Sequence, residues 1–409
     1  MTDNLPLLAR QPIFDRKMNV VAYELLCRDT DENRAIFSDA DRASSQVMLR
    51  AFTDLAIEDV IGKHKAYINF TRKLLDTSPP FNRQQLVIEV LEGIEVDDKL
   101  VSRLANLRSE GYTIALDDFE LNQETLPLLD HADIVKLDVL ALSDGQLKEY
   151  VEFLQSYELT LLAEKVETYE MLEKCKSLGF DLFQGFFLSR PKLIKGRQIS
   201  ENRQAIMQLL AQLNDPATEV GEIETLISHD PVLSYKLLKL INSAAFNLVT
   251  EIESLRQAIT LLGLLQIRSW VTLLAMSNIS NKPLELSVTS MCRARFCQVL
   301  GLAITGKRRA DSHFTVGLLS TLDAFLDTPL EELLDKISLN ANLVNALLKY
   351  EGTEGKILKI AMTYERGDWD NIDWPFLEQN KVSASELAAM YTSSLSWTTS
   401  ALENISLTE

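Results

Sequence analysis

The sequence changes character near residue 190, and this change constrains the fold more than any other feature. Before it, short apolar runs alternate with amphipathic segments, the pattern of βα units around a parallel sheet. After it, strand-like runs nearly vanish. The sequence predicts a TIM-like (β/α)8 α/β barrel over residues 1–192, a linker over 193–200 and an all-α domain with a helical tail over 201–409. A chain of 409 residues is long enough for each part to bury its own core.

Seven apolar runs in the first part are expected to form strands. They are Val20–Cys27, Ala66–Phe70, Leu86–Leu91, Tyr112–Asp118, Ile134–Leu137, Leu159–Glu164 and Asp181–Phe187. The runs LARQPIF and NVVAYELL flank the turn Asp15–Asn19 and predict an opening β-hairpin. Between the strands lie helical patterns such as Asp98–Glu110, whose leucines fall on one face. Seven or eight strands in this length fit a compact barrel.

Composition excludes several classes of function. The chain carries 41 Lys+Arg against 59 Asp+Glu, a net charge of −18, which argues against nucleic acid and anionic membranes as partners. Its four cysteines form no CxxC pair, as expected for a reducing cytoplasm. No run of about 20 apolar residues is present. The expected protein is cytoplasmic and has no membrane span.

Polar or ionised residues stand where the predicted strands end. They are Asn69, Glu89, Asp117, Asp118, Lys136, Glu164 and Gln184, and Glu24 occupies the same kind of position within VVAYELL. In a (β/α)8 barrel these ends converge on the face that carries chemistry. A single acid at a strand end is more often a helix cap or a solvated residue. Five acids in one pocket would repel one another, so cations are expected.

The residue types indicate which cations would bind. Carboxylate oxygens with one Asn amide suit Mg²⁺, Mn²⁺ or Ca²⁺, and the sequence has no His/Cys cluster of the kind that zinc prefers. Two divalent cations would leave about one net negative charge on the five carboxylates, whereas one would leave about three. The sequence therefore predicts two metal ions, the usual device for activating water in phosphoryl displacement.

Several motifs in the first part resemble the EAL domain, a family of bacterial cyclic di-GMP phosphodiesterases. In order, they are Glu24-Leu-Leu26-Cys-Arg28, Asp117-Asp118-Phe119, Lys136-Leu-Asp138, Ala-Glu164-Lys-Val-Glu167-Thr and Gln184-Gly185 with the residues to Pro191. The resemblance covers roughly residues 8–192 and rests on ordered motifs. It implies a barrel that binds Mg²⁺ or Mn²⁺ and linearises cyclic di-GMP to 5′-pGpG, in control of motility and biofilm formation.

The resemblance also implies roles for individual residues. The metal ligands would be Glu24, Asn69, Glu89, Asp117 and Asp118. Arg28 would contact the substrate phosphate, with Leu26 beside it. Lys136 would hold the water or the phosphate, and Glu164 would be the catalytic-side glutamate. Gln184 would support the substrate and the water, and Glu167 would steady the adjoining loop.

One motif departs from the family. Active members usually follow Asp-Asp-Phe with a glycine-containing turn, but this chain reads Glu120-Leu121-Asn122-Gln123 there. Glycine adopts positive φ at little energetic cost and allows close approach of the backbone. Glu120 and Leu121 adopt such conformations only at a higher energetic cost. Two alternatives to the enzyme therefore stay open: a catalytically inactive effector that binds cyclic di-GMP, and a signalling scaffold.

The second part resembles the HDOD domain over about residues 200–280. The resemblance rests on Ser228–Leu233, on Leu238–Phe246 and on Ala258–Gly263, and it implies an interaction module with an unidentified protein partner. His229-Asp230 is the pair that an HD phosphohydrolase would use, but Asp230-Pro231 is better explained as a helix start. Ser254 is the expected start of a further helix, and Gly263 is expected to end it in a left-handed cap. A homodimer is also expected.

Overall fold

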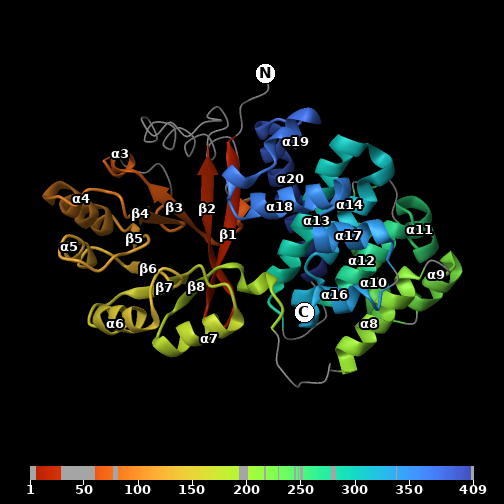
Figure 1. Cartoon of the computed structure of the whole chain (residues 1–409), viewed down its shortest axis with the longest axis horizontal. Helices are drawn as coiled ribbons and strands as arrows, with labels where there is room; N and C mark the ends of the chain where they lie inside the picture. The colour runs from red at the N-terminus through yellow and green to blue at the C-terminus, as the bar shows by residue number, and fades with distance from the viewer. Residues whose placement is uncertain are drawn as a thin grey trace. The chain divides into compact units, whose positions relative to one another are not determined.

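The computed structural model describes residues 6–28, 60–76, 82–192, 201–215, 218–228, 230–243, 246, 248, 252–277, 282–337 and 339–406. The chain divides into two compact units, and along the sequence the first gives way to the second after Leu188. The first unit is a closed barrel of eight strands, and the described part of the second is helical (Figure 1). The predicted fold class is confirmed in both parts.

The strands follow one another around the barrel in sequence order. They are β1 (Leu7–Asp15), β2 (Val20–Arg28), β3 (Lys65–Phe70), β4 (Leu86–Val90), β5 (Thr113–Leu116), β6 (Ile134–Asp138), β7 (Thr160–Glu164) and β8 (Leu182–Gln184). β1 is antiparallel to β2 and to β8, and the other neighbouring strands are parallel. The predicted hairpin is confirmed: Asp15 Oδ1 closes its turn by accepting hydrogen bonds from the backbone N–H groups of Lys17 and Asn19.

Short helices cover the outside of the barrel (Figure 1). They are α3 (Arg72–Leu75), α4 (Asp98–Ser109), α5 (Leu126–Leu129), α6 (Asp144–Leu154) and α7 (Tyr169–Leu178), followed by the 3₁₀ helix η1 (Phe186–Ser189). In α4, the side chain of Asp97 caps the first turn by accepting a hydrogen bond from Leu100 N at 2.7 Å. Leu100, Leu104 and Leu107 are buried, so the predicted apolar face of this helix packs inward.

The last strand is shorter than the sequence predicts, because Gly185 ends it. Its φ of 148° is one that side chains rarely adopt, and a Cβ there would lie 2.1 Å from the Val166 carbonyl oxygen. Val166 N donates to the Gln184 carbonyl oxygen at 3.0 Å. The close approach of these two loops turns the chain away from the barrel directly after Gln184.

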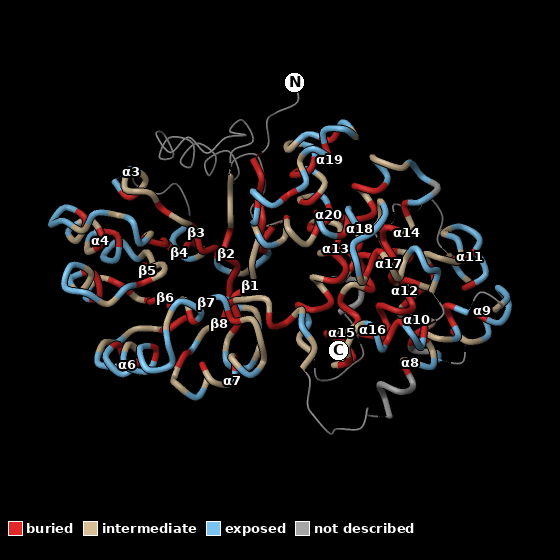
Figure 2. Tube along the Cα trace, in the orientation of Figure 1, coloured by how far each residue is buried: buried red, intermediate tan, exposed pale blue. Residues whose placement is uncertain are grey.

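One layer of apolar side chains closes the barrel interior. Seven strands contribute a buried member each and β8 adds the partly buried Leu182; the seven are Ile13, Ala22, Tyr67, Val87, Ala115, Ile134 and Leu162. Figure 2 shows the strands as mostly buried and the surrounding helices as largely exposed. Because side chains alternate along a strand, residues two positions further along share this inner face and form the next layer.

The described part of the second unit is built from helices. They are α8 (Glu201–Asn214), α9 (Val220–Ser228), α10 (Pro231–Ile241), α11 (Leu255–Leu262), α12 (Leu264–Ser277), α13 (Leu284–Thr305), α14 (Ala310–Leu319), α15 (Leu322–Leu326), α16 (Leu330–Leu334), α17 (Ala341–Lys349), α18 (Gly352–Glu365), α19 (Trp374–Gln379) and α20 (Ala384–Ser406), with 3₁₀ turns η3 (Lys307–Arg309) and η4 (Trp369–Asn371). Within the described residues, none of the helices combines the length and apolar character needed to cross a membrane.

Two of the predicted helix starts are confirmed. Asp230 Oδ1 accepts a hydrogen bond from Leu233 N at 3.0 Å at the start of α10, and the Ser254 side chain accepts from Gln257 N at the start of α11. Gly263 does end α11, but its ψ of 158° lies outside the left-handed helical region that the sequence predicts. His229 lies outside the described residues.

Aromatic rings fill the centre of the helical unit. Trp270 is fully buried, and its ring centroid lies 5.2 Å from that of Phe314 and 5.5 Å from that of Trp397. Both contacts are tilted, and such contacts add to the free energy gained by burial. The rings join α12, α14 and α20, which the sequence separates widely, into one core.

Candidate active site

Seven polar side chains form the layer above the apolar core. Each stands two residues along the chain after a residue of the apolar layer, and Asp117 directly follows the end of β5: Glu24, Asn69, Glu89, Asp117, Lys136, Glu164 and Gln184. They therefore lie on the inner face of the barrel, at the carboxyl ends of the parallel strands. Glu24, Glu89, Lys136, Glu164 and Gln184 are buried. The structure thus brings together seven of the eight strand-end residues that the sequence singles out.

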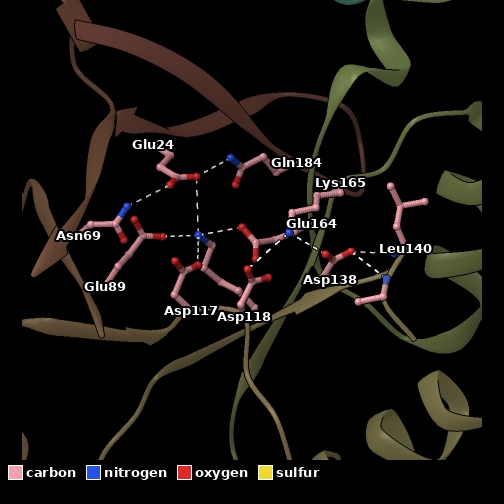
Figure 3. A network of polar contacts seen from close by, with 12 residues as sticks. Glu24, Asn69, Glu89, Asp117, Asp118, Asp138, Leu140, Glu164, Lys165 and Gln184 are labelled. Carbon is pink, nitrogen blue, oxygen red and sulfur yellow. Dashed lines mark hydrogen bonds and ion pairs between the residues drawn. The ribbon is translucent and has the colours of Figure 1, made fainter. Parts of the chain in front are cut away.

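Lys136 stands at the centre of this layer. Its Nζ lies 2.5 Å from Glu89 Oε1, 2.6 Å from Asp117 Oδ1, 2.8 Å from Glu164 Oε1 and 3.6 Å from Glu24 Oε2, and its side chain is fully buried. Figure 3 shows these four carboxylates pointing toward one another. One ammonium among four ionised carboxylates would leave a large excess of negative charge in a largely buried site.

The proton affinities in this cluster reflect its charge and burial. Burial raises the pKa of Glu164 to about 8 and outweighs the opposing effect of Lys136. Burial also raises the pKa of Glu89 well above its usual value. For Lys136, burial favours the neutral amine, but the surrounding carboxylates raise its pKa well above the ordinary value. Additional positive charge, from protons or from metal ions, would therefore stabilise the cluster.

Glu24 is held by amide groups on both sides. Gln184 Nε2 donates to Glu24 Oε2 at 2.5 Å and to Gln11 Oε1 at 3.0 Å, and Asn69 Nδ2 donates to Glu24 Oε1 at 3.5 Å. Sequence reasoning missed Gln11. It stands two residues before the core residue Ile13 rather than after it, because β1 runs antiparallel to its neighbours. A predicted hairpin with this strand direction is the signal that could have found it.

Several oxygens of the layer are buried without a hydrogen bond from the described residues. They are Asn69 Oδ1, Glu89 Oε2, Asp118 Oδ1 and Gln184 Oε1. Buried acceptors in this state are costly and call for a donor or a cation. Within the described ranges, however, no group of three or more His, Cys, Asp or Glu side chains is arranged to hold a metal ion. The donor set fits a hard cation, and the carboxylates face Lys136 instead.

Asp118 lies at the edge of this layer and joins a second group of charges. Lys165 Nζ lies 2.6 Å from Asp138 Oδ2 and 3.4 Å from Asp118 Oδ2 (Figure 3). Sequence reasoning assigned no role to Asp138 or Lys165. The signal for Asp138 is its place two residues after Lys136 on β6, which puts both side chains on one face of the strand.

The remaining predicted residues lie further out. Leu26 and Arg28 stand two and four residues past Glu24 on β2, and Glu167 stands in the loop after β7. All three side chains are half-buried.

The turn that lacks glycines closes through side chains. Asn122 Oδ1 accepts hydrogen bonds from the N–H groups of Glu124 and Thr125, and Thr125 Oγ1 donates to the Glu120 carbonyl oxygen at 2.6 Å. No residue from 119 to 125 has a positive φ. Phe119 is buried and its N–H donates to the Lys136 carbonyl oxygen at 3.0 Å. The turn thus keeps contact with the site without the glycine conformations.

Comparison with protein families gives two matches. The model of the EAL domain matches residues 7–191, and the model of the HDOD domain matches residues 200–346. The first match spans the barrel and the polar layer within it. The second begins at α8 and ends within α17, ahead of the last helices of the chain.

Two curated proteins resemble the chain over nearly its whole length. Cyclic di-GMP phosphodiesterase CdgJ of Vibrio cholerae is 35% identical over 377 residues, which cover 91% of this chain and 87% of that protein. Uncharacterized protein YuxH of Bacillus subtilis is 33% identical over 401 residues, covering 95% and 97%.

Among solved structures, Klebsiella pneumoniae BlrP1 with calcium and cyclic di-GMP is 26% identical, with a TM-score of 0.39. The match covers 47% of this chain and 57% of that one.

Proposed function

The chain belongs to the family of proteins that join an EAL domain to an HDOD domain, and we propose that it is a cyclic di-GMP phosphodiesterase that forms 5′-pGpG. The observation that carries the proposal is the polar layer itself. Carboxylates from four strand ends meet a buried lysine at the mouth of a closed barrel, and oxygens of the same layer lack hydrogen bonds. CdgJ, which matches both domains in one chain, carries the same activity in its name.

We propose that two Mg²⁺ or Mn²⁺ ions bind this layer. Their ligands would be Glu24, Asn69, Glu89, Asp117 and Asp118. When all of them are ionised, these acids together with Glu164 and the Lys136 ammonium carry four net negative charges, which two divalent cations would balance. When bound, such cations supply an activated water and neutralise phosphate charge. Bound there, the cations would replace Lys136 as the partner of some of these carboxylates.

The chain's own residues would then bind the substrate and move protons. Lys136, once released from its carboxylates, is a donor toward the phosphate or the water. Glu164 has a raised pKa of about 8, which suits a residue that accepts and returns a proton near neutral pH. Arg28 and Leu26 would contact the dinucleotide. The attack forms one P–O bond from water and breaks the P–O3′ bond, whose oxygen takes the proton.

The remaining residues keep the site in place. Gln184 fixes Glu24 through its 2.5 Å hydrogen bond and would also support substrate and water, and Glu167 would steady the loop after β7. We propose further that the HDOD region binds an unidentified protein partner, that the protein forms a homodimer, and that it acts in the cytoplasm on motility or biofilm formation.

The glycine-free turn at Glu120 and Leu121 is the observation that favours a second function, a cyclic di-GMP effector without catalysis. Incubating the full chain with cyclic di-GMP and Mn²⁺ separates the two. The enzyme produces 5′-pGpG steadily, Glu24→Ala abolishes it, and Glu173→Ala, an exposed acid on α7, leaves it unchanged. Binding of the dinucleotide without pGpG at any metal concentration would establish the effector. Binding of neither metal nor dinucleotide would indicate a scaffold.

A further inference from the structure

The loop after β7 places a lysine beside the proposed metal ligands. Lys165 has a φ of 56° and Asp118 a φ of 40°, both in the left-handed region that residues other than glycine rarely occupy. Strained backbone of this kind persists where surrounding contacts fix it, often at functional sites. Here the two strained residues face each other, with Lys165 Nζ 3.4 Å from Asp118 Oδ2.

A rigid acceptor anchors the lysine. Asp138 Oδ1 accepts hydrogen bonds from the N–H groups of Leu140 and Ala141 at 2.8 and 3.1 Å. Its other oxygen, Oδ2, lies 2.6 Å from Lys165 Nζ. The ammonium is therefore held at the end of β6, from which it reaches the neighbouring Asp118.

The two oxygens of Asp118 have different surroundings. Oδ2 faces the Lys165 ammonium, whereas Oδ1 is buried and accepts no hydrogen bond from any described residue. The ion pair thus fixes the side chain with one oxygen left for another cation. It also places a positive charge next to the carboxylate that this cation would use.

We propose that Lys165 is a positioning residue that also competes with one of the two metal ions. Its ammonium orients Asp118 and weakens the binding of a divalent cation to that carboxylate. The inference rests on the proposed function, in which Asp118 is a metal ligand. An ammonium and a divalent cation that share one carboxylate repel each other because both are positively charged. Lys165 is only half-exposed, so solvent and salt screen this repulsion only in part. Ligands around Lys136 lie outside this ion pair, so the effect falls on one ion.

The test is a titration of the full chain with Mn²⁺, followed by the electron paramagnetic resonance signal of free Mn²⁺. Lys165→Met should tighten the weaker of two Mn²⁺ sites by on the order of ten-fold and leave the tighter site unchanged. Lys165→Arg, which keeps the charge, should resemble the wild type. Lys174→Met removes one lysine from a surface ion pair with Asp144 and should change neither site.

A double variant localises the effect. With Asp118→Asn already present, Lys165→Met should no longer tighten Mn²⁺ binding, because the shared carboxylate is gone. Equal dissociation constants for the wild type and Lys165→Met would overturn the inference, and so would equal tightening in Lys174→Met. If the wild type and all variants bind no Mn²⁺, the proposed metal-dependent function itself is wrong, and this inference falls with it.

Discussion

Replacing Lys136 with methionine tests how the polar layer is held together. The change removes the only ammonium in contact with Glu24, Glu89, Asp117 and Glu164 among the described residues and leaves a side chain of similar length. Removing one partner of a buried ion pair costs about 3–5 kcal/mol. For a domain of this size each kcal/mol lowers the melting temperature by roughly 2–4 °C. We expect the barrel of Lys136→Met to melt roughly 6–20 °C below the wild type at pH 8 without metal.

Two treatments should restore the lost stability. Divalent cations that bind the folded state at about 100 times their dissociation constant contribute roughly 3 kcal/mol, so Mn²⁺ should recover much of the melting temperature. Lowering the pH should also raise the melting temperature of Lys136→Met. The folded pKa of Glu164 is about 8, against an ordinary value of 4.5, so the folded state binds more protons than the unfolded state between these pH values. Stability therefore falls as pH rises from about 4.5 through 8.

The assay is thermal unfolding by circular dichroism at pH 5 and pH 8, with and without Mn²⁺. The matched control is Lys148→Met, which removes an exposed lysine paired with Glu152 at 3.6 Å and should change the melting temperature little. An unchanged melting temperature in Lys136→Met at pH 8 would show that Lys136 does not stabilise the polar layer. So would a lowered one that neither acid nor Mn²⁺ raises again.

Three further substitutions test individual parts of the fold. Gly185→Ala places a Cβ against the Val166 carbonyl and should cost about 1–3 kcal/mol in urea unfolding; a neutral result would contradict the close approach. Asn122→Ala removes two hydrogen bonds from the glycine-free turn and should increase amide exchange at residues 120–125 about ten-fold, while unchanged exchange would argue against that closure. Burial raises the pKa of Asp323 from 3.8 to about 6, so its folded form binds the proton more tightly and stability is lost as pH rises from 3.8 through 6. Asp323→Asn should therefore stabilise the helical unit by up to about 3 kcal/mol at pH 8 and little at pH 4; equal effects at both pH values would contradict the raised pKa.

Much of the site could be predicted because the period of a strand is two. Alternation alone places Glu89 and Glu164 one layer above Val87 and Leu162. Because the barrel is closed, side chains in the same layer lie close together. The same rule fails where strand direction changes, which is why Gln11 was missed. It also gives no distances, so the sequence did not reveal that Lys136 holds the carboxylates.

Other features depend on contacts between distant segments. Lys165 meets Asp138 across a separation of 27 residues, and nothing in the local pattern around either residue indicates the pair. Likewise, β8 ends at Gln184 because Gly185 approaches Val166 closely, whereas the apolar run itself continues to Phe187. Local propensity was overridden by tertiary packing in this case.

The source of the oxygen in the product distinguishes hydrolysis of cyclic di-GMP at this site from binding alone. The purified chain is incubated with cyclic di-GMP and Mn²⁺ in water enriched in ¹⁸O, and the product is analysed by mass spectrometry. We expect 5′-pGpG with one ¹⁸O atom in its terminal phosphate from the unaltered chain, and no pGpG from Glu24→Ala. Bound cyclic di-GMP that stays intact, or pGpG that carries no label, would contradict hydrolysis at this site.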